Sequence, residues 1–245
     1  MNQVYPESVS GITVNRFCAS GLEAINLAAA RIKCDQNPLL IAGGVESMSR
    51  MPMGTDGGAL MMDPHTANLG GYIPQGVAAD LIANLKRYAR RDLDQWAVRS
   101  HEKAAYAQDQ GFFKKSLVPV KNALGKSYLA YDEMVRSSTN METLAKLKPS
   151  FAHLAQNLGF KERALKKYPQ LEDLESFHHP GNSSSIVDGA SAVLLGNQDV
   201  GKKLNLKPRA KIRAWANVAT EPTIMLTGPG PATIKALKKA DLTLE

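Results

Sequence analysis

Cysteine is scarce in this chain. Its 245 residues include two cysteines, Cys18 and Cys34, which form no C-x-x-C pair, so the sequence offers no disulfide framework. No apolar run approaches the length that spans a bilayer, and the N-terminus shows neither the basic nor the apolar region of a signal peptide. We therefore predict a cytoplasmic protein without a membrane partner. An organelle matrix, entered with a presequence that is later removed, is the alternative.

Aromatic residues are also few, at 6%, whereas 44% of the residues are hydrophobic and 22% are charged. This composition is ordinary for a soluble globular protein, and the length suits one large domain or two smaller ones. The net charge of +7 makes nucleic acid one candidate partner. However, the Lys and Arg residues are dispersed, and no helix-turn-helix, zinc-finger or aromatic RNP pattern accompanies them. We predict no nucleic-acid partner, and we interpret most of the lysines as solvated surface residues.

The stretch from Gly11 to Ile32 changes its hydrophobic pattern halfway. Residues 12–17 predict a short strand, and from Ala19 apolar residues recur at three- and four-residue steps, which predicts a helix. Cys18 lies at the changeover. The unpaired N–H groups and the positive dipole end of a helix N-terminus favour a thiolate, the nucleophilic form of cysteine. A buried, inert cysteine packed between strand and helix is the alternative.

The residues around Cys18, V-N-R-F-C-A-S-G-L-E-A-I, resemble the acyl-enzyme signature of the thiolases, which are acetyl-CoA acyltransferases and acetyltransferases. The resemblance implies an α/β, layered α-β-α thiolase-like fold with an inserted loop domain, and Cys18 as the nucleophile that carries the acyl group. Four further stretches resemble the same family in the same order. They are A-G-G-V-E-S-M-S-R-M-P at 42–52, A-K-L-K-P-S-F at 145–151, G-N-S-S-S-I-V-D-G-A-S-A-V at 181–193 and G-P-G-P-A-T-I-K-A-L-K-K-A at 228–240.

Three thiolase segments have no counterpart in these residues. They are the Asn-Glu-Ala-Phe segment, the Gly-His-Pro segment with the base that activates the nucleophile, and the Cys-x-Gly segment with the second catalytic cysteine. Thiolases also have residues before the Cys18 segment, including the first strand and helix of their N-terminal domain. We therefore expect a central thiolase fragment that lacks both ends and is inactive alone.

The resemblance also predicts a domain organisation. Residues 1–47 and 181–200 would belong to the N-terminal thiolase domain, residues 48–180 to the inserted loop domain, and residues 201–245 to the start of the C-terminal domain.

Periodicity predicts further elements along the chain. The order strand, helix, strand over residues 12–42 indicates a parallel pair, with Gly43-Gly44 ending its second strand. Asp92 is the expected N-cap of a helix, and Gly111 the residue that follows its end. The helices are expected over 76–91, 93–110 and 231–240, the strands over 39–42, 186–195 and 210–218, and irregular structure with short helices over 112–180.

Residues that contact coenzyme A follow from the resemblance. Ser184 would hydrogen-bond the pantetheine amide, Phe151 would pack beside the pantetheine, and Arg136 would lie near the adenine nucleotide. The alternatives are a turn serine, a core phenylalanine and a surface arginine. The chain departs from the family at His179-Pro180, where Thr-Ala is usual, at Ser185 in place of Gly, and at Gln75-Gly76 in place of Met-Gly. These departures affect the details of CoA binding. CoA would be a substrate, and no cofactor is expected.

His178 and His179 raise the possibility of a metal site. Adjacent histidines point apart on a strand and cannot chelate one ion alone, and no third ligand motif lies nearby. We predict no metal. We interpret Cys34, which has no family counterpart, as structural.

The predicted function is thiolase acyl transfer through Cys18, as in fatty-acid β-oxidation, with acyl-CoA and CoA as partners. A homo-oligomer is expected for the full-length protein. The alternative is a catalytically incomplete fragment that at most binds CoA. A decarboxylating ketoacyl synthase is a weaker candidate, because its nucleophile context differs from N-R-F-C-A-S-G.

Overall fold

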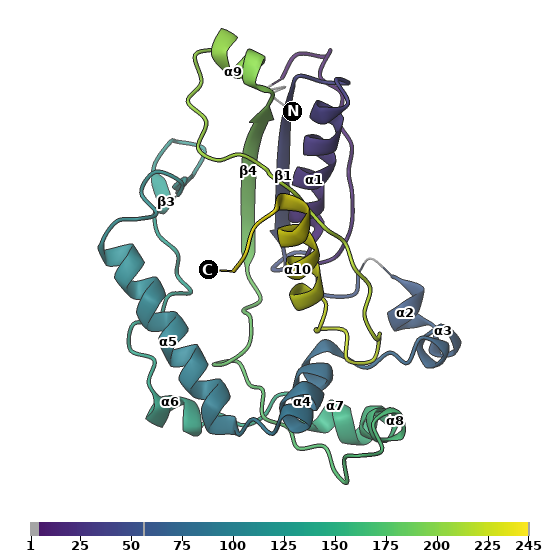
Figure 1. Ribbon diagram of the computed structural model, residues 1–245. Helices are drawn as coiled ribbons and strands as arrows, with labels where there is room; N and C mark the ends of the chain where they lie inside the picture. The colour runs from purple at the N-terminus through teal and green to yellow at the C-terminus, as the bar shows by residue number, and fades with distance from the viewer. Residues whose placement is uncertain (1–4, 56, 245) are drawn as a thin grey trace. The chain divides into compact units, whose positions relative to one another are not determined.

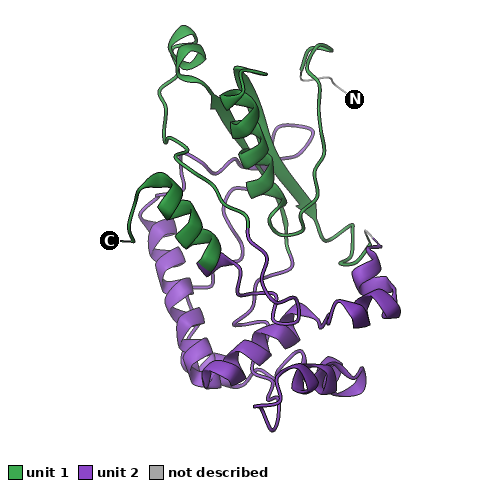
Figure 2. Cartoon of the chain, turned by 45° about the vertical axis from the view of Figure 1, so that its right-hand side comes forward, with its two compact units in different colours: residues 1–55, 187–217, 231–245 green, residues 56–186, 218–230 purple. Residues whose placement is uncertain are grey.

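A computed structural model describes residues 5–55 and 57–244 (Figure 1). The chain divides into two compact units, each described by itself below. The domain boundaries predicted above refer to the domains of thiolases and not to these two units, so they stay a prediction. Unit 1 comprises residues 1–55, 187–217 and 231–245, and unit 2 comprises residues 56–186 and 218–230 (Figure 2).

Unit 1 is built on a helix that covers a two-stranded sheet. Ala28 and Ala29 of the helix pack against Ala42 and Leu195 of the two strands, and all four are buried. Small side chains allow this close approach of helix and sheet. The elements of this unit are α1 (Ser20–Lys33), β1 (Leu39–Ser47), β4 (Asp188–Gly196), α9 (Gln198–Lys203) and most of α10 (Pro229–Ala240).

β1 and β4 form the sheet of unit 1. The strand predicted over residues 186–195 forms as β4, and it pairs with β1 in antiparallel direction. The prediction that Gly43-Gly44 ends β1 is wrong, because the strand runs on to Ser47. A Cβ atom at Gly43 would lie 2.8 Å from the carbonyl oxygen of Ser191. Glycine therefore lets the two backbones approach closely inside the sheet.

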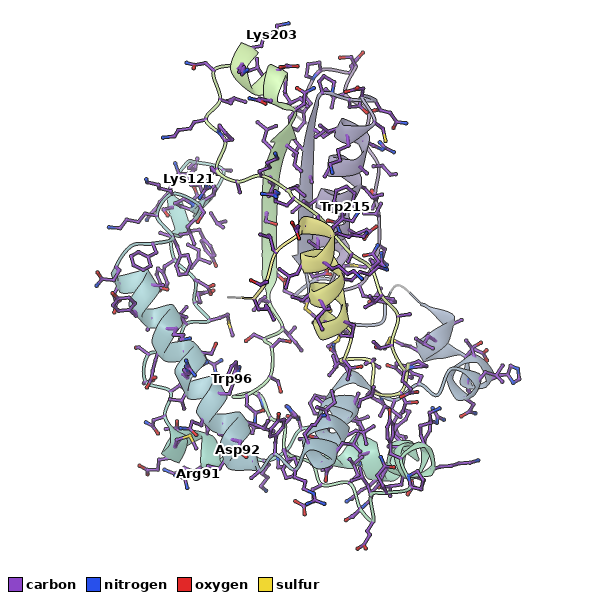
Figure 3. The ribbon with its side chains drawn as sticks, in the orientation of Figure 1. Arg91, Asp92, Trp96, Lys121, Lys203 and Trp215 are labelled. Carbon is purple, nitrogen blue, oxygen red and sulfur yellow. The ribbon has the colours of Figure 1, made fainter. Side chains whose placement is uncertain are left out.

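Two predicted strands do not form. Residues 12–15 have no regular structure, and Phe17 has φ 49°, which no strand residue adopts. With no described strand beside them, the parallel pair predicted with β1 is also wrong. Residues 210–218 are irregular as well, and the carbonyls of Trp215 and Asn217 accept hydrogen bonds from lysine side chains of α10 (3.2 and 3.0 Å; Figure 3 labels Trp215).

Unit 2 is mostly helical. Its core contains Ile73, Val77 and Leu81, which are fully buried, together with Ala155 and Ala164. The short helices predicted over 112–180 form, and the same region also contains a short antiparallel pair of strands that was not predicted. The elements are α2 (Ala59–Met62), α3 (Pro64–Leu69), α4 (Gln75–Lys86), α5 (Arg90–Asp109), β2 (Val120–Lys121), β3 (Ser127–Leu129), α6 (Met141–Ala145), α7 (Ala152–Asn157) and α8 (Phe160–Lys167).

The ends of the long helices depart from the prediction in two places. α4 ends at Lys86, because Arg87 adopts a left-handed conformation (φ 58°). The N-cap of α5 is Ala89 rather than Asp92; Asp92 lies in the first turn, and its carboxylate accepts the Ala89 N–H (2.8 Å; Figure 3). Gly111 follows the C-cap at φ 69°, as predicted. Across the described residues, no helix combines the length and the apolar character needed to cross a membrane.

Candidate active site

The turn before α1 holds Cys18. Its preceding residue, Phe17, has φ 49°, a conformation that is costly for a bulky side chain, at roughly 1–3 kcal/mol. Neighbouring hydrogen bonds hold it there. The Asn15 Oδ1 accepts the Phe17 N–H (2.9 Å), and the Ser20 hydroxyl donates to the Phe17 carbonyl (2.7 Å) while its oxygen accepts the Arg16 N–H (2.8 Å). The motif N-R-F-C-A-S thus encodes a closed turn, where the hydrophobic pattern had predicted a strand.

Cys18 lies directly before the N-cap residue of α1, Ala19, and its thiol is free and exposed. Within the described chain, its backbone N–H has no hydrogen-bond acceptor. The N–H groups of Ala19 and Ser20 donate to the carbonyls of Arg16 and Phe17 (both 3.0 Å), and the positive end of the dipole of a 14-residue helix lies here. The arrangement suits an oxyanion that forms next to the sulfur. The exposure of Cys18 contradicts the buried position of the alternative, and the reactivity of the thiol stays a prediction.

Cys34 occupies the opposite end of the same helix. It is the C-cap residue of α1, it is also exposed, and its N–H donates to the Ala30 carbonyl (3.0 Å). The two thiols therefore share accessibility and differ in the sign of the helix dipole beside them. Cys34 is an internal reference for any effect of the helix on Cys18.

β1 lies beside the first turn of α1. A Cβ atom built on Gly44 of β1 would lie 3.8 Å from the Cα atom of Gly21, in the first turn of α1. At the end of β1, the Asp188 carboxylate accepts hydrogen bonds from both the hydroxyl and the N–H of Ser49. The Ser49 hydroxyl, followed by its N–H, lowers the pKa of Asp188. The sequence did not predict these hydrogen bonds, although Ser49 lies in the motif at 42–52 and Asp188 in the motif at 181–193.

The three residues predicted to contact CoA all belong to unit 2, whereas Cys18 belongs to unit 1. Phe151 is half-buried and packs on the core, with its ring so close to Gly76 that a Cβ there would lie 2.3 Å away. Ser184 is exposed on an irregular segment. Arg136 is exposed, and its N–H donates to the His101 Nδ1 (3.2 Å). Hydrogen bonds connect the segments that carry Phe151 and Ser184, because the Ser150 N–H donates to the His178 carbonyl (2.8 Å).

The two adjacent histidines bind different partners. His178 Nδ1 lies 2.6 Å from Asp80 of α4, and His179 Nε2 lies 2.8 Å from Asp94 of α5. Each imidazole is thus engaged with a carboxylate. Among the residues that the structure describes, no group of three or more His, Cys, Asp or Glu side chains is placed to hold a metal ion. The pairing of each histidine with a buried aspartate was not visible in the sequence.

Comparisons with known proteins converge on one family. The family described as "Thiolase, N-terminal domain" matches residues 2–156. A β-ketoadipyl-CoA thiolase of Pseudomonas aeruginosa is 36% identical over 258 residues, covering 98% of this chain and 59% of the relative. A 3-ketoacyl-CoA thiolase of Photorhabdus laumondii is 35% identical over 244 residues, covering 98% and 57%. The chain therefore spans somewhat more than half the length of these relatives.

A solved structure agrees with the sequence relatives. The dimeric peroxisomal thiolase of Saccharomyces cerevisiae superposes with a TM-score of 0.80 at 29% identity, covering 98% of this chain and 56% of the yeast chain. The mixed helix and sheet described above is thus part of a thiolase α/β fold, as predicted.

Proposed function

The chain belongs to the thiolase family, and from this membership we propose that its chemistry is acyl transfer from a 3-oxoacyl-CoA to CoA, with Cys18 as the nucleophile. The observation that carries the proposal is the exposed Cys18 thiol in a closed turn at the N-terminus of α1. The names of the relatives support a 3-oxoacyl-CoA substrate, and β-oxidation is the degradative setting that we propose.

The proposed reaction proceeds in two steps. The Cys18 thiolate attacks the 3-keto carbon, the Cα–Cβ bond breaks, and the acyl group stays on sulfur as a thioester. The electron pair of the broken bond leaves on Cα, which takes a proton to give acetyl-CoA. In the second step the thiolate of CoA attacks the thioester, and Cys18 leaves as a thiolate. We propose that in both steps the Cys18 N–H donates to the developing oxyanion.

A second candidate is a polypeptide that binds CoA and does not complete the cycle. In the described structure no His, Lys or second Cys side chain bonds to Cys18, and the family segments that supply base and acid have no match in the sequence. We therefore propose that thiolysis by this 245-residue chain alone is negligible.

One experiment separates the two candidates. The chain is incubated with acetoacetyl-CoA and CoA, acetyl-CoA formation is followed, and acylated peptides are mapped by mass spectrometry. Acetyl groups on Cys18 that are absent in Cys18→Ala and retained in Cys34→Ser support the nucleophile. Steady turnover would contradict the incomplete cycle, and acylation of Cys34 alone would contradict the role of Cys18.

Three further properties remain proposals. CoA acts as a substrate and no cofactor is bound, the protein is cytoplasmic, and the full-length protein assembles into a homo-oligomer. The dimeric yeast relative supports the assembly. Sedimentation velocity on the purified chain tests it, because a strictly monomeric chain at micromolar concentration would contradict assembly through these residues.

A further inference from the structure

A buried carboxylate in unit 2 joins three segments of chain. Asp94 of α5 has a side chain that is 3% exposed. Its Oδ2 accepts the Arg90 Nε–H (2.8 Å), and its Oδ1 accepts hydrogen bonds from the His179 Nε2 (2.8 Å) and the Asn182 Nδ2 (2.9 Å). A buried carboxylate with this many charge-assisted and neutral donors is held in one position, and it holds its donors in return.

His179 is the donor that fixes the turn before Ser184. The ring is fully buried, and its Nδ1 accepts the Gly181 N–H (3.0 Å). Because Nδ1 accepts, the hydrogen is assigned to Nε2 and points to Asp94, so both ring nitrogens have a hydrogen-bond partner. The His179 N–H in turn donates to the Asn182 Oδ1 (2.8 Å). These bonds close residues 179–182 into a single anchored turn.

Arg90 connects the same carboxylate to a second segment. Its guanidinium donates to the carbonyls of Leu144 (2.7 Å), which directly precedes the A-K-L-K-P-S-F motif, and of Leu147 (3.0 Å), which lies within it. The two segments also touch directly. A Cβ atom at Gly181 would lie 2.4 Å from Leu144 and 2.9 Å from Leu147. One buried group thus sets the positions of the segment that ends at Phe151 and the segment that continues to Ser184.

We propose that His179, through Asp94 and Arg90, is a positioning residue for CoA binding. It places the Ser184 hydroxyl and the Phe151 ring relative to one another, so that both can meet the same pantetheine arm. The inference rests on the proposed function, in which these two residues contact CoA. The proposed role also involves a position at which the chain differs from the family, because His179-Pro180 stands where Thr-Ala is usual.

The test compares His179→Ala and His179→Gln with the wild-type chain. His153→Ala on α7 is the matched control, because that histidine is exposed and its side chain makes no hydrogen bond among the described residues. CoA affinity is measured by titration calorimetry, and hydrogen–deuterium exchange is measured for the peptide covering 177–185. Circular dichroism shows whether each variant is folded.

We expect His179→Ala to bind CoA about tenfold more weakly, because the turn before Ser184 loses its hydrogen bond to the Asp94 carboxylate. Exchange of the N–H groups of residues 181–184 should rise with it. His179→Gln keeps a donor near the Nε2 position, so it should recover part of the CoA affinity and part of the protection from exchange. His153→Ala should match the wild type in both. A folded His179→Ala chain with wild-type CoA affinity would overturn the inference while leaving the proposed function intact.

Two other outcomes remain decisive. If His179→Ala does not fold, His179→Gln is compared with His179→Asn, which keeps an acceptor near Nδ1 and loses the donor to Asp94. The inference then requires tighter CoA binding by Gln than by Asn, and equal affinities would overturn it. If the wild-type chain binds no CoA, the proposed function fails, and the positioning role in CoA binding fails with it.

Discussion

The Cys18 turn of unit 1 and the Asp94 network of unit 2 are both held by side-chain hydrogen bonds, but these bonds span very different distances along the sequence. The side-chain bonds of the turn join residues two to seven positions apart, and they are exposed. The bonds from Asp94 and Arg90 to distant segments span 54 to 88 residues, and all but one are buried or partly buried. A local turn can form from a short motif alone, whereas a long-range network forms only with the folded unit. We therefore expect perturbations of the network to cost more stability than perturbations of the turn.

The largest effect is expected for Asp94→Ala. Removing this carboxylate leaves the Arg90 guanidinium and the His179 ring without their buried partner, which should lower the free energy of unfolding by about 3–5 kcal/mol. Denaturant unfolding measures the change. Glu142→Ala is the control, because its pair with Lys146 is exposed and should contribute less than about 1 kcal/mol. Equal losses for the two variants would remove the distinction between buried and exposed bonds.

Gly76→Ala should have the next largest effect. The new methyl group would lie 2.3 Å from the Phe151 ring, so the ring or the helix must shift, at about 1–3 kcal/mol. The better helix propensity of Ala offsets about 1 kcal/mol of this. Gly201 lies in α9, and a Cβ atom there would lie 4.0 Å from the Leu206 carbonyl oxygen, so Gly201→Ala should be neutral or stabilising. The thermal unfolding midpoints of both variants measure these effects. A Gly76→Ala chain that is more stable than the wild type would show that the Phe151 ring is not fixed in its position.

Ser20→Ala should have a smaller effect on stability and a visible one on the turn. The change removes the bonds to the Arg16 N–H and the Phe17 carbonyl, which together contribute about 1 kcal/mol at an exposed site. Because Phe17 then loses support for its left-handed conformation, we expect slower alkylation of Cys18. Ser10→Ala is the control, since Ser10 is exposed and makes no hydrogen bond within the described structure. An unchanged alkylation rate in Ser20→Ala would show that the turn does not govern the thiol.

The smallest effect is a pH dependence at Asp188. Its pKa is lowered in the folded chain, first by the Ser49 hydroxyl. A lowered carboxyl pKa gives stability that is present above the unfolded value of about 3.9 and is lost as the pH falls through the folded value. Asp188→Asn should therefore flatten the acid limb of stability below about pH 4. Unfolding midpoints between neutral and acidic pH measure this, and an identical acid limb in the variant would contradict it.

The parts of the fold that could be predicted from the sequence depend on short-range order. α1 and α10 follow from apolar spacing, and the end of α5 follows from Gly111, because these signals lie within one or two turns of the chain. The strands at 12–17 and 210–218 were wrongly predicted. A hydrophobic pattern shows only that a segment would suit a strand, and in the described chain neither segment has a neighbouring strand to pair with.

The residues of the candidate site also divide into those that a local signal predicts and those that depend on long-range contacts. Cys18 was found because its signature is contiguous and because the helix after it is periodic. The Asp94–His179 bond was not found, because the two residues are 85 positions apart and each looks ordinary in its own segment. The left-handed Phe17 was also missed, since a bulky aromatic residue gives no signal for that conformation, which here depends on Asn15 and Ser20.

The central claim is that the turn and the helix N-terminus make Cys18 the reactive thiol of this chain. The most direct test is the rate of iodoacetamide alkylation of Cys18 and Cys34 in the same sample at neutral pH, followed by peptide mapping. Both thiols are exposed, and they lie at opposite ends of α1. We predict that Cys18 is alkylated several times faster. Alkylation of Cys34 at an equal or greater rate would contradict the claim.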